Sequence, residues 1–150
     1  MIRRKPLICV LLSIGAATLV YNVMATPKPH DLFERAVHVA PSSSVNIRHS
    51  YVNGPLVSRV IWIDFRIPST QLKHLLAAGQ YVGYNTPEKR RLANDFRTLN
   101  PPRWWKPKQV PSNYRVYARL RSSVSDDWAT STYLVIDPDR QEVYAVSYGN

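Results

Sequence analysis

The chain has 150 residues, and its twenty lysines and arginines against ten acidic residues give a formal net charge of +10. A single cysteine excludes a disulfide framework within the chain and a zinc site built on cysteines. Hydrophobic residues make up 45% of the chain and aromatic residues 11%, which excludes disorder throughout. The length indicates one domain.

The N-terminus has the three parts of a secretory signal peptide. Arg3, Arg4 and Lys5 form a basic start, residues 7–20 are an apolar run, and Val23-Met24-Ala25 resembles a cleavage site. We therefore expect residues 1–25 to be a signal peptide that is removed after Ala25. The alternative is an uncleaved membrane anchor, although the apolar run is shorter than the ~20 residues that a spanning helix needs. Both readings place the domain outside the cytoplasm.

Cleavage would remove Cys9 and three of the twenty basic residues, so residues 26–150 would carry a net charge of +7 and no cysteine. A small exported domain without disulfides and without an Asn-x-Ser/Thr glycosylation site favours a bacterial envelope over a eukaryotic secretory route. The predicted location is the bacterial periplasm, or the inner membrane with the domain facing the periplasm.

After a proline-rich spacer at residues 26–29, residues 30–150 read as one α+β domain. The expected elements in chain order are a helix (30–39), two strands (45–52 and 59–67), two helices (69–78 and 86–99) and three strands (114–121, 129–136 and 142–148). These elements predict a sheet of about five antiparallel or mixed strands, with two or three helices packed on one face.

Some details of these elements follow from single residues. Asp31 and Ser69 are expected to cap their helices, and Gly79 to end the helix 69–78. In the strand 45–52, strict alternation places His49 and Tyr51 on the same face as Ile47.

No catalytic or metal-binding pattern is visible. The four histidines lack the spacing of metal ligands, and there is no nucleophile elbow or phosphate-binding loop. The acidic pairs Asp126-Asp127 and Asp137/Asp139 lie in predicted turns, where aspartate usually binds its own backbone. We therefore expect no metal and no cofactor.

Two basic and aromatic features are candidates for binding. The first is an arginine face, on which Arg115, Tyr117, Arg119 and Arg121 share one side of a strand. Arg48, Arg66 and Trp62 are expected on the polar sides of other strands. Such a face suits an anionic polymer, a phosphate head group or an acidic protein, but it also fits an ordinary solvated sheet surface.

The second feature is the segment 101–108, in which Trp104 and Trp105 lie among prolines and basic residues. These rings suit a membrane interface or a protein contact. The competing interpretation is that one or both tryptophans fold back over the core.

The function predicted from these features is a small, non-enzymatic envelope module that binds an anionic component or a protein partner. The alternatives are a small periplasmic hydrolase whose site is not visible in the sequence, and a secreted toxin or inhibitor. Nucleic acid is a disfavoured partner, because export takes the chain away from the cytoplasm.

Overall fold

The computed structural model describes residues 27–54, 59–84, 86–107, 110–119 and 130–149. The predicted signal peptide therefore lies outside the described residues. Among the helices of the described ranges, none has the length and apolar character needed to cross a membrane.

The centre of the domain is a six-stranded antiparallel sheet with the order β1-β2-β6-β5-β4-β3. Its strands are β1 (Asn46–Asn53), β2 (Val60–Arg66), β3 (Val82–Gly83), β4 (Arg115–Arg119), β5 (Thr130–Asp137) and β6 (Glu142–Gly149). The helices are α2 (Pro29–Val37), α3 (Ser69–Ala78) and α4 (Thr86–Thr98). The α+β class and the order of the predicted elements are confirmed. The additional strand is β3, whose two residues are too few to show an alternating pattern.

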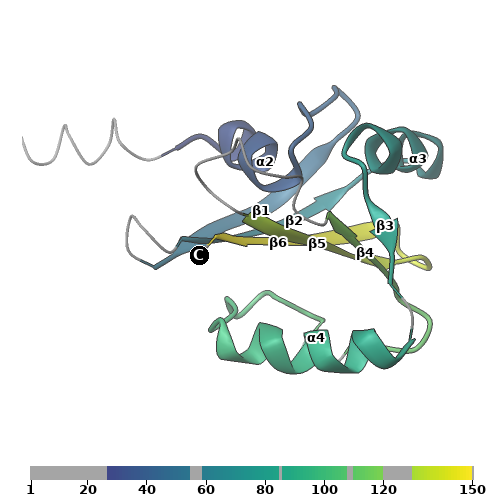
Figure 1. Cartoon of the computed structure of the whole chain (residues 1–150). Coiled ribbons are helices and arrows are strands. Elements are labelled where there is room, and N and C mark those ends of the chain that lie inside the picture. The colour runs from purple at the N-terminus through teal and green to yellow at the C-terminus, as the bar shows by residue number, and fades with distance from the viewer. Residues whose placement is uncertain (1–26, 55–58, 85, 108–109, 120–129, 150) are drawn as a thin grey trace, which may run out of the picture.

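The helices cover both faces of the sheet, so the prediction that they pack on one face is wrong. Figure 1 shows α2 and α3 on one side of the sheet and α4 on the other. The α2/α3 core consists of Leu32, Phe33, Ala36, Val37, Ile63, Phe65, Ile67, Leu75, Leu134, Ile136, Val143 and Ala145. The α4 core consists of Trp62, Leu92, Phe96, Trp105, Val116, Ala118, Tyr133, Val135, Tyr144 and Val146.

The central strands explain why both faces are covered. In β6, Val143 and Ala145 belong to the α2/α3 core, whereas Tyr144 and Val146 belong to the α4 core. A strand that is apolar on both sides must be covered on both sides, because either exposed face would leave apolar surface in water.

The helix ends differ from the expected capping pattern. Pro29 is the first residue of α2, so Asp31 lies inside the first turn instead of preceding the helix. The boundaries of α3 agree with the prediction, but the capping position is Pro68 and the Ser69 side chain does not cap. Gly79 follows α3 as expected, with an ordinary φ of −81°. Its neighbour Gln80 has the left-handed φ of 55°.

A β-bulge in β1 changes the faces of that strand. Ile47 pairs with Phe65 and His49 pairs with Asp64, so Arg48 is an extra residue without its own partner on β2. After the bulge the alternation shifts by one, and Val52 joins Ile47 in packing against the α2/α3 core. His49, which was expected on the face of Ile47, instead contacts Asp64.

Candidate functional site

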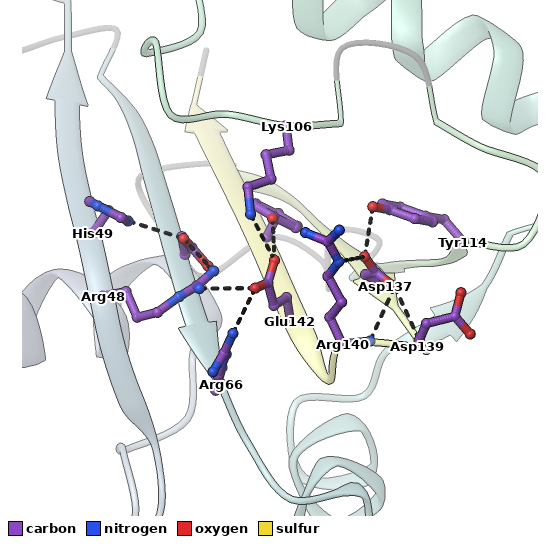
Figure 2. Close-up of polar contacts among 11 residues, drawn as sticks. Arg48, His49, Arg66, Lys106, Tyr114, Asp137, Asp139, Arg140 and Glu142 are labelled. Carbon is purple, nitrogen blue, oxygen red and sulfur yellow. Dashed lines mark hydrogen bonds and ion pairs between the residues drawn. The ribbon is translucent and has the colours of Figure 1, made fainter.

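Two buried carboxylates lie among basic side chains on the α4 side of the sheet. Asp64 belongs to β2 and Glu142 to the neighbouring β6, and their side chains are only 3% and 2% exposed. An ionised carboxylate at this depth requires compensating donors, because burial removes its water. The donors come from β1, β2, β6 and the segment after α4, and Figure 2 shows Arg48, Arg66 and Lys106 among them around Glu142.

Arg48 connects the two carboxylates. Its Nη2 atom lies 2.6 Å from Asp64 Oδ1 and 2.7 Å from Asp64 Oδ2, and its Nη1 atom lies 2.9 Å from Glu142 Oε1. Next to it, His49 Nδ1 lies 3.0 Å from Asp64 Oδ2. The bulge makes this arrangement possible, since two consecutive residues of β1 contact one carboxylate. Burial opposes the charge on Arg48, but its hydrogen bonds to Asp64 and Glu142 outweigh burial and raise its pKa above the ordinary value.

Glu142 accepts hydrogen bonds at both oxygens. Oε1 lies 2.9 Å from Arg48 Nη1 and 3.0 Å from Arg66 Nη2, while Oε2 lies 3.3 Å from Lys106 Nζ and 2.7 Å from the Tyr144 hydroxyl. Burial acts to raise the pKa of Glu142, but these four donors outweigh it and hold the pKa far below its usual range. Glu142 is therefore an ionised structural anchor and does not have the properties of a general acid.

Tyr144 is fixed in its neutral form by the same contact. Burial raises its pKa above the ordinary value of 10, and the hydrogen bond to Glu142 raises it further. Besides His49, the network contains three basic side chains and two carboxylates; the basic side chains are Arg48, Arg66 and Lys106. Because the oxygens of both carboxylates are already engaged, the arrangement joins strands rather than leaving a base available for a substrate.

The tryptophan segment folds back onto the sheet. Trp105 is 1% exposed and lies edge-to-face against Trp62 at 4.5 Å and Tyr144 at 5.6 Å between ring centroids. Trp104 is half-buried and stacks on His49 at 5.2 Å. Lys106 then reaches Glu142, so three consecutive residues bind the segment to the sheet. Trp105 therefore folds back over the core, as the competing interpretation of this segment predicts, and its ring is not exposed to solvent.

Trp62 does not lie on a polar surface as expected from the sequence. It was expected on the polar side of its strand, but it is fully buried in the α4 core. Arg66, on the same side of β2, is exposed and donates to Glu142. One strand face therefore changes from apolar to charged along its length, because the α4 layer covers Trp62 and ends before Arg66.

A third buried carboxylate, that of Asp137, lies at the end of β5. Its Oδ1 atom accepts from the backbone N–H groups of Asp139 at 3.1 Å and Arg140 at 3.3 Å, which is the predicted use of aspartate in a turn. Its Oδ2 atom accepts from the Tyr114 hydroxyl at 2.9 Å, and Figure 2 shows this group beside the Glu142 network. Burial raises the pKa of Tyr114 to about 12, assisted by this hydrogen bond. Asp126-Asp127 lies outside the described residues.

The arginine strand is only partly the face that alternation predicts. Arg115, Tyr117 and Arg119 do share one side of β4, whereas Val116 and Ala118 enter the α4 core. Arg115 is exposed, but Tyr117 is half-buried and packs against the α2/α3 core. Arg121 lies outside the described residues. The face is therefore mixed, with arginines at either side of an apolar contact.

A cavity of about 320 Å³ lies where this side of β4 meets α3. Arg115 and Lys73 contribute cations to its wall, and Asp137 contributes a carboxylate. The remaining lining residues are Ile67, Ser69, Leu72, Leu76, Tyr117, Ile136, Pro138, Gln141 and Val143. Within the described part of the chain, neither Arg115 nor Lys73 forms an ion pair, whereas the Asp137 carboxylate is engaged by Tyr114 and its own turn. We call this the α3 cavity.

Three functional candidates were missed by sequence reasoning. Asp64 lies in the predicted strand 59–67 and was not recognised as buried, and Glu142 was taken only as the start of a strand. The available signal was an acid inside the apolar run Val60–Phe65, which is unusual unless a cation accompanies it. Lys73 gives no comparable signal, because a lysine on a helix is ordinarily a solvated residue.

Comparisons with known proteins add no family to this description. No protein-family model matches the chain, and no curated protein or solved structure matches it either.

Proposed function

We propose that this chain is an exported, non-enzymatic binding module of the bacterial envelope, and that the α3 cavity binds a small anion with a short apolar part. The observation that carries the proposal is the combination in one cavity of two cations, Arg115 and Lys73, that form no ion pair with the described residues, and the apolar side chains of Leu72, Leu76 and Val143.

The charge of the cavity favours an anionic ligand. Two cations against the single carboxylate of Asp137 leave one net positive charge. The Asp137 oxygens already accept hydrogen bonds from Tyr114 and from the turn. A carboxylate or phosphate ligand would supply the counter-charge that Arg115 and Lys73 do not receive from the part of the chain that the structure describes, and Arg115 is suited to bidentate contact with either group.

The size and lining limit the rest of the ligand. A volume of about 320 Å³ is at the lower end of small-molecule sites, which supports a compact ligand. Leu72, Leu76 and Ile136 offer apolar contact beside the cations, so an alkyl chain would move from water into contact with these side chains. Export is supported by the sequence pattern of residues 1–25.

The non-enzymatic part of the proposal rests on the carboxylate network. Asp64 and Glu142 are the most buried acids among the residues that the structure describes, and their oxygens are engaged by Arg48, His49, Arg66, Lys106 and Tyr144. A general base needs a free lone pair directed at a substrate. The oxygens of Asp64 and Glu142 instead accept hydrogen bonds that connect β1, β2 and β6.

Titration of the ¹⁵N-labelled protein with sodium octanoate, followed by NMR, tests the proposal. Octylamine is the matched probe, since it has the same chain length and the opposite charge. We expect octanoate to shift amide signals in α3 and β4, with weaker binding at higher salt. Equal shifts with octylamine, or no shifts with octanoate, would reject an anion-binding α3 cavity.

Variants connect the binding to the named cations. Arg115→Gln and Lys73→Gln should each weaken octanoate binding about tenfold, because a charge-assisted hydrogen bond contributes roughly 1.5–3 kcal/mol. Arg35→Gln is the matched control, since Arg35 lies in α2 and does not line the cavity. An equal loss in the control would indicate a non-specific charge effect.

A further inference from the structure

A second cavity, of about 310 Å³, lies on the opposite side of the sheet from the α3 cavity. Three tyrosines line it, Tyr84, Tyr133 and Tyr148, together with Arg91, Leu92 and Asp95 of α4. Tyr133 and Leu92 also belong to the α4 core, so the floor of this cavity is part of the buried interior. We call it the tyrosine cavity.

The tyrosine rings are arranged around Tyr133. The Tyr84 ring lies edge-to-face with it at 5.8 Å, and the Tyr148 ring stacks on it at 6.0 Å with an interplanar angle of 23°. Burial raises the pKa of Tyr133 to about 12, and its side-chain hydrogen bond with Tyr148 contributes in the same direction. A hydrogen bond with Tyr84 acts in the opposite direction. The three hydroxyl groups therefore meet at one place.

The helix adds one group of each charge. Arg91 and Asp95 are four residues apart and lie on the same side of α4, one turn from each other. Between them, Leu92 is buried, and so is Phe96 after Asp95. In the described part of the chain neither Arg91 nor Asp95 forms an ion pair. Their charges cancel, so the cavity has no net charge but is rich in hydrogen-bonding groups.

We propose that the tyrosine cavity binds one residue of a neutral saccharide. A sugar hydroxyl both donates and accepts, as a tyrosine hydroxyl does, and so the two kinds of group can satisfy each other. Asp95 accepts from adjacent sugar hydroxyls and Arg91 donates to them. The tyrosine rings offer apolar surface to the C–H groups of a pyranose.

Other ligand classes fit this cavity less well. A simple anion or cation would meet one attractive and one repulsive charge, because Arg91 and Asp95 lie one turn apart. An apolar ligand would displace water from Arg91 and Asp95 without offering either side chain a polar contact, which is unfavourable. The proposal is independent of the α3 cavity, since the two sites use different residues on opposite faces of the sheet.

The test is an NMR titration of the ¹⁵N-labelled protein with four neutral tetrasaccharides: tetra-N-acetylchitotetraose, maltotetraose, cellotetraose and mannotetraose. We expect at least one to shift the amide signals of α4 and of the residues around Tyr133. If none of the four shifts these signals at millimolar concentration, the proposal is wrong.

Variants then distinguish the site from adventitious binding. Tyr148→Phe should weaken binding about fivefold, because it removes one hydroxyl and keeps the ring, and Arg91→Gln should weaken it by at least as much. Arg91 is exposed, so its variant tests the site without disturbing the core. Tyr51→Phe is the matched control, since Tyr51 is an exposed tyrosine of β1 outside the cavity. Unchanged binding in the two site variants, or an equal loss in the control, would overturn the proposal.

Discussion

Arg48 on β1 donates to both carboxylate oxygens of Asp64 on β2 through a single nitrogen, with Nη2 at 2.6 Å from Oδ1 and 2.7 Å from Oδ2. The same guanidinium reaches Glu142 on β6 through Nη1. One side chain of the edge strand thus contacts both the neighbouring strand β2 and the strand beyond it, β6. This contact exists because the bulge places Arg48 and His49 together against Asp64.

Replacing Arg48 by methionine is expected to destabilise the fold by about 3 kcal/mol, because it leaves two buried carboxylates short of a partner. The measurement is the free energy of unfolding in urea at pH 7. Arg35→Met on the exposed surface of α2 is the control and should change stability by less than about 0.5 kcal/mol. A loss no larger than that of the control would show that Arg66, Lys106 and His49 suffice.

Acid should weaken the fold through Glu142. Its folded-state pKa lies far below the ordinary value of 4.5, so the unfolded chain takes up the proton more readily. The stabilisation is therefore complete above about pH 4.5 and is lost progressively as the pH falls below that value toward the folded-state pKa. Urea unfolding from pH 7 to pH 3 should show a stability difference from Glu142→Gln that shrinks only below pH 4.5. A constant difference across this range would contradict the assignment.

Alkaline titration should separate the tyrosines into two groups. Burial raises the pKa of Tyr81 and Tyr144 above the ordinary value of 10, and it raises those of Tyr114 and Tyr133 to about 12. Absorbance at the phenolate band should therefore show at least four of the nine tyrosines still protonated at pH 11 in the folded protein. In denaturant all nine should titrate near pH 10. Coincident titration curves would mean that these rings are accessible to water.

The Tyr81 ring packs so closely against the residue after α3 that position 79 has room only for glycine. A Cβ atom there would lie 2.4 Å from a ring carbon of Tyr81, whose hydroxyl donates to the Val37 carbonyl at 3.0 Å. Gly79→Ala should therefore displace this ring and lower stability by about 1–3 kcal/mol. Thermal unfolding measures the effect. The double variant Gly79→Ala with Tyr81→Leu should lose less than the sum of the single variants, and strict additivity would exclude the clash.

The types and order of the main elements could be predicted from local patterns. Alternating apolar residues in 59–67 and helical spacing in 69–78 depend only on neighbours along the chain, and β2 and α3 form at those places. Pro68 and the turn residues 137–141 predict breaks between elements, and the structure has breaks at 67–68 and at 138–141, with Asp137 still the last residue of β5. The candidate Arg115 was likewise identified from its exposed place on a strand.

The remaining features depend on which elements meet in space. The bulge at Arg48 reverses the expected face of His49, because a slip of one residue moves every later side chain to the other side. Trp62 and Arg66 lie on one strand face, yet only Trp62 is covered by the α4 layer. No local pattern carries that information.

The sequence by itself determined the α+β class and the order of the principal elements, since hydrophobic periodicity and turn chemistry act over a few residues. Only the tertiary structure decided that helices cover both sheet faces, that Asp64 and Glu142 are buried and share Arg48, and that two cavities lie on opposite sides. The physical reason is that burial and ion pairing are set by the depth and neighbours of each group, and residues such as Arg48 and Glu142, 94 positions apart, meet only when the sheet forms.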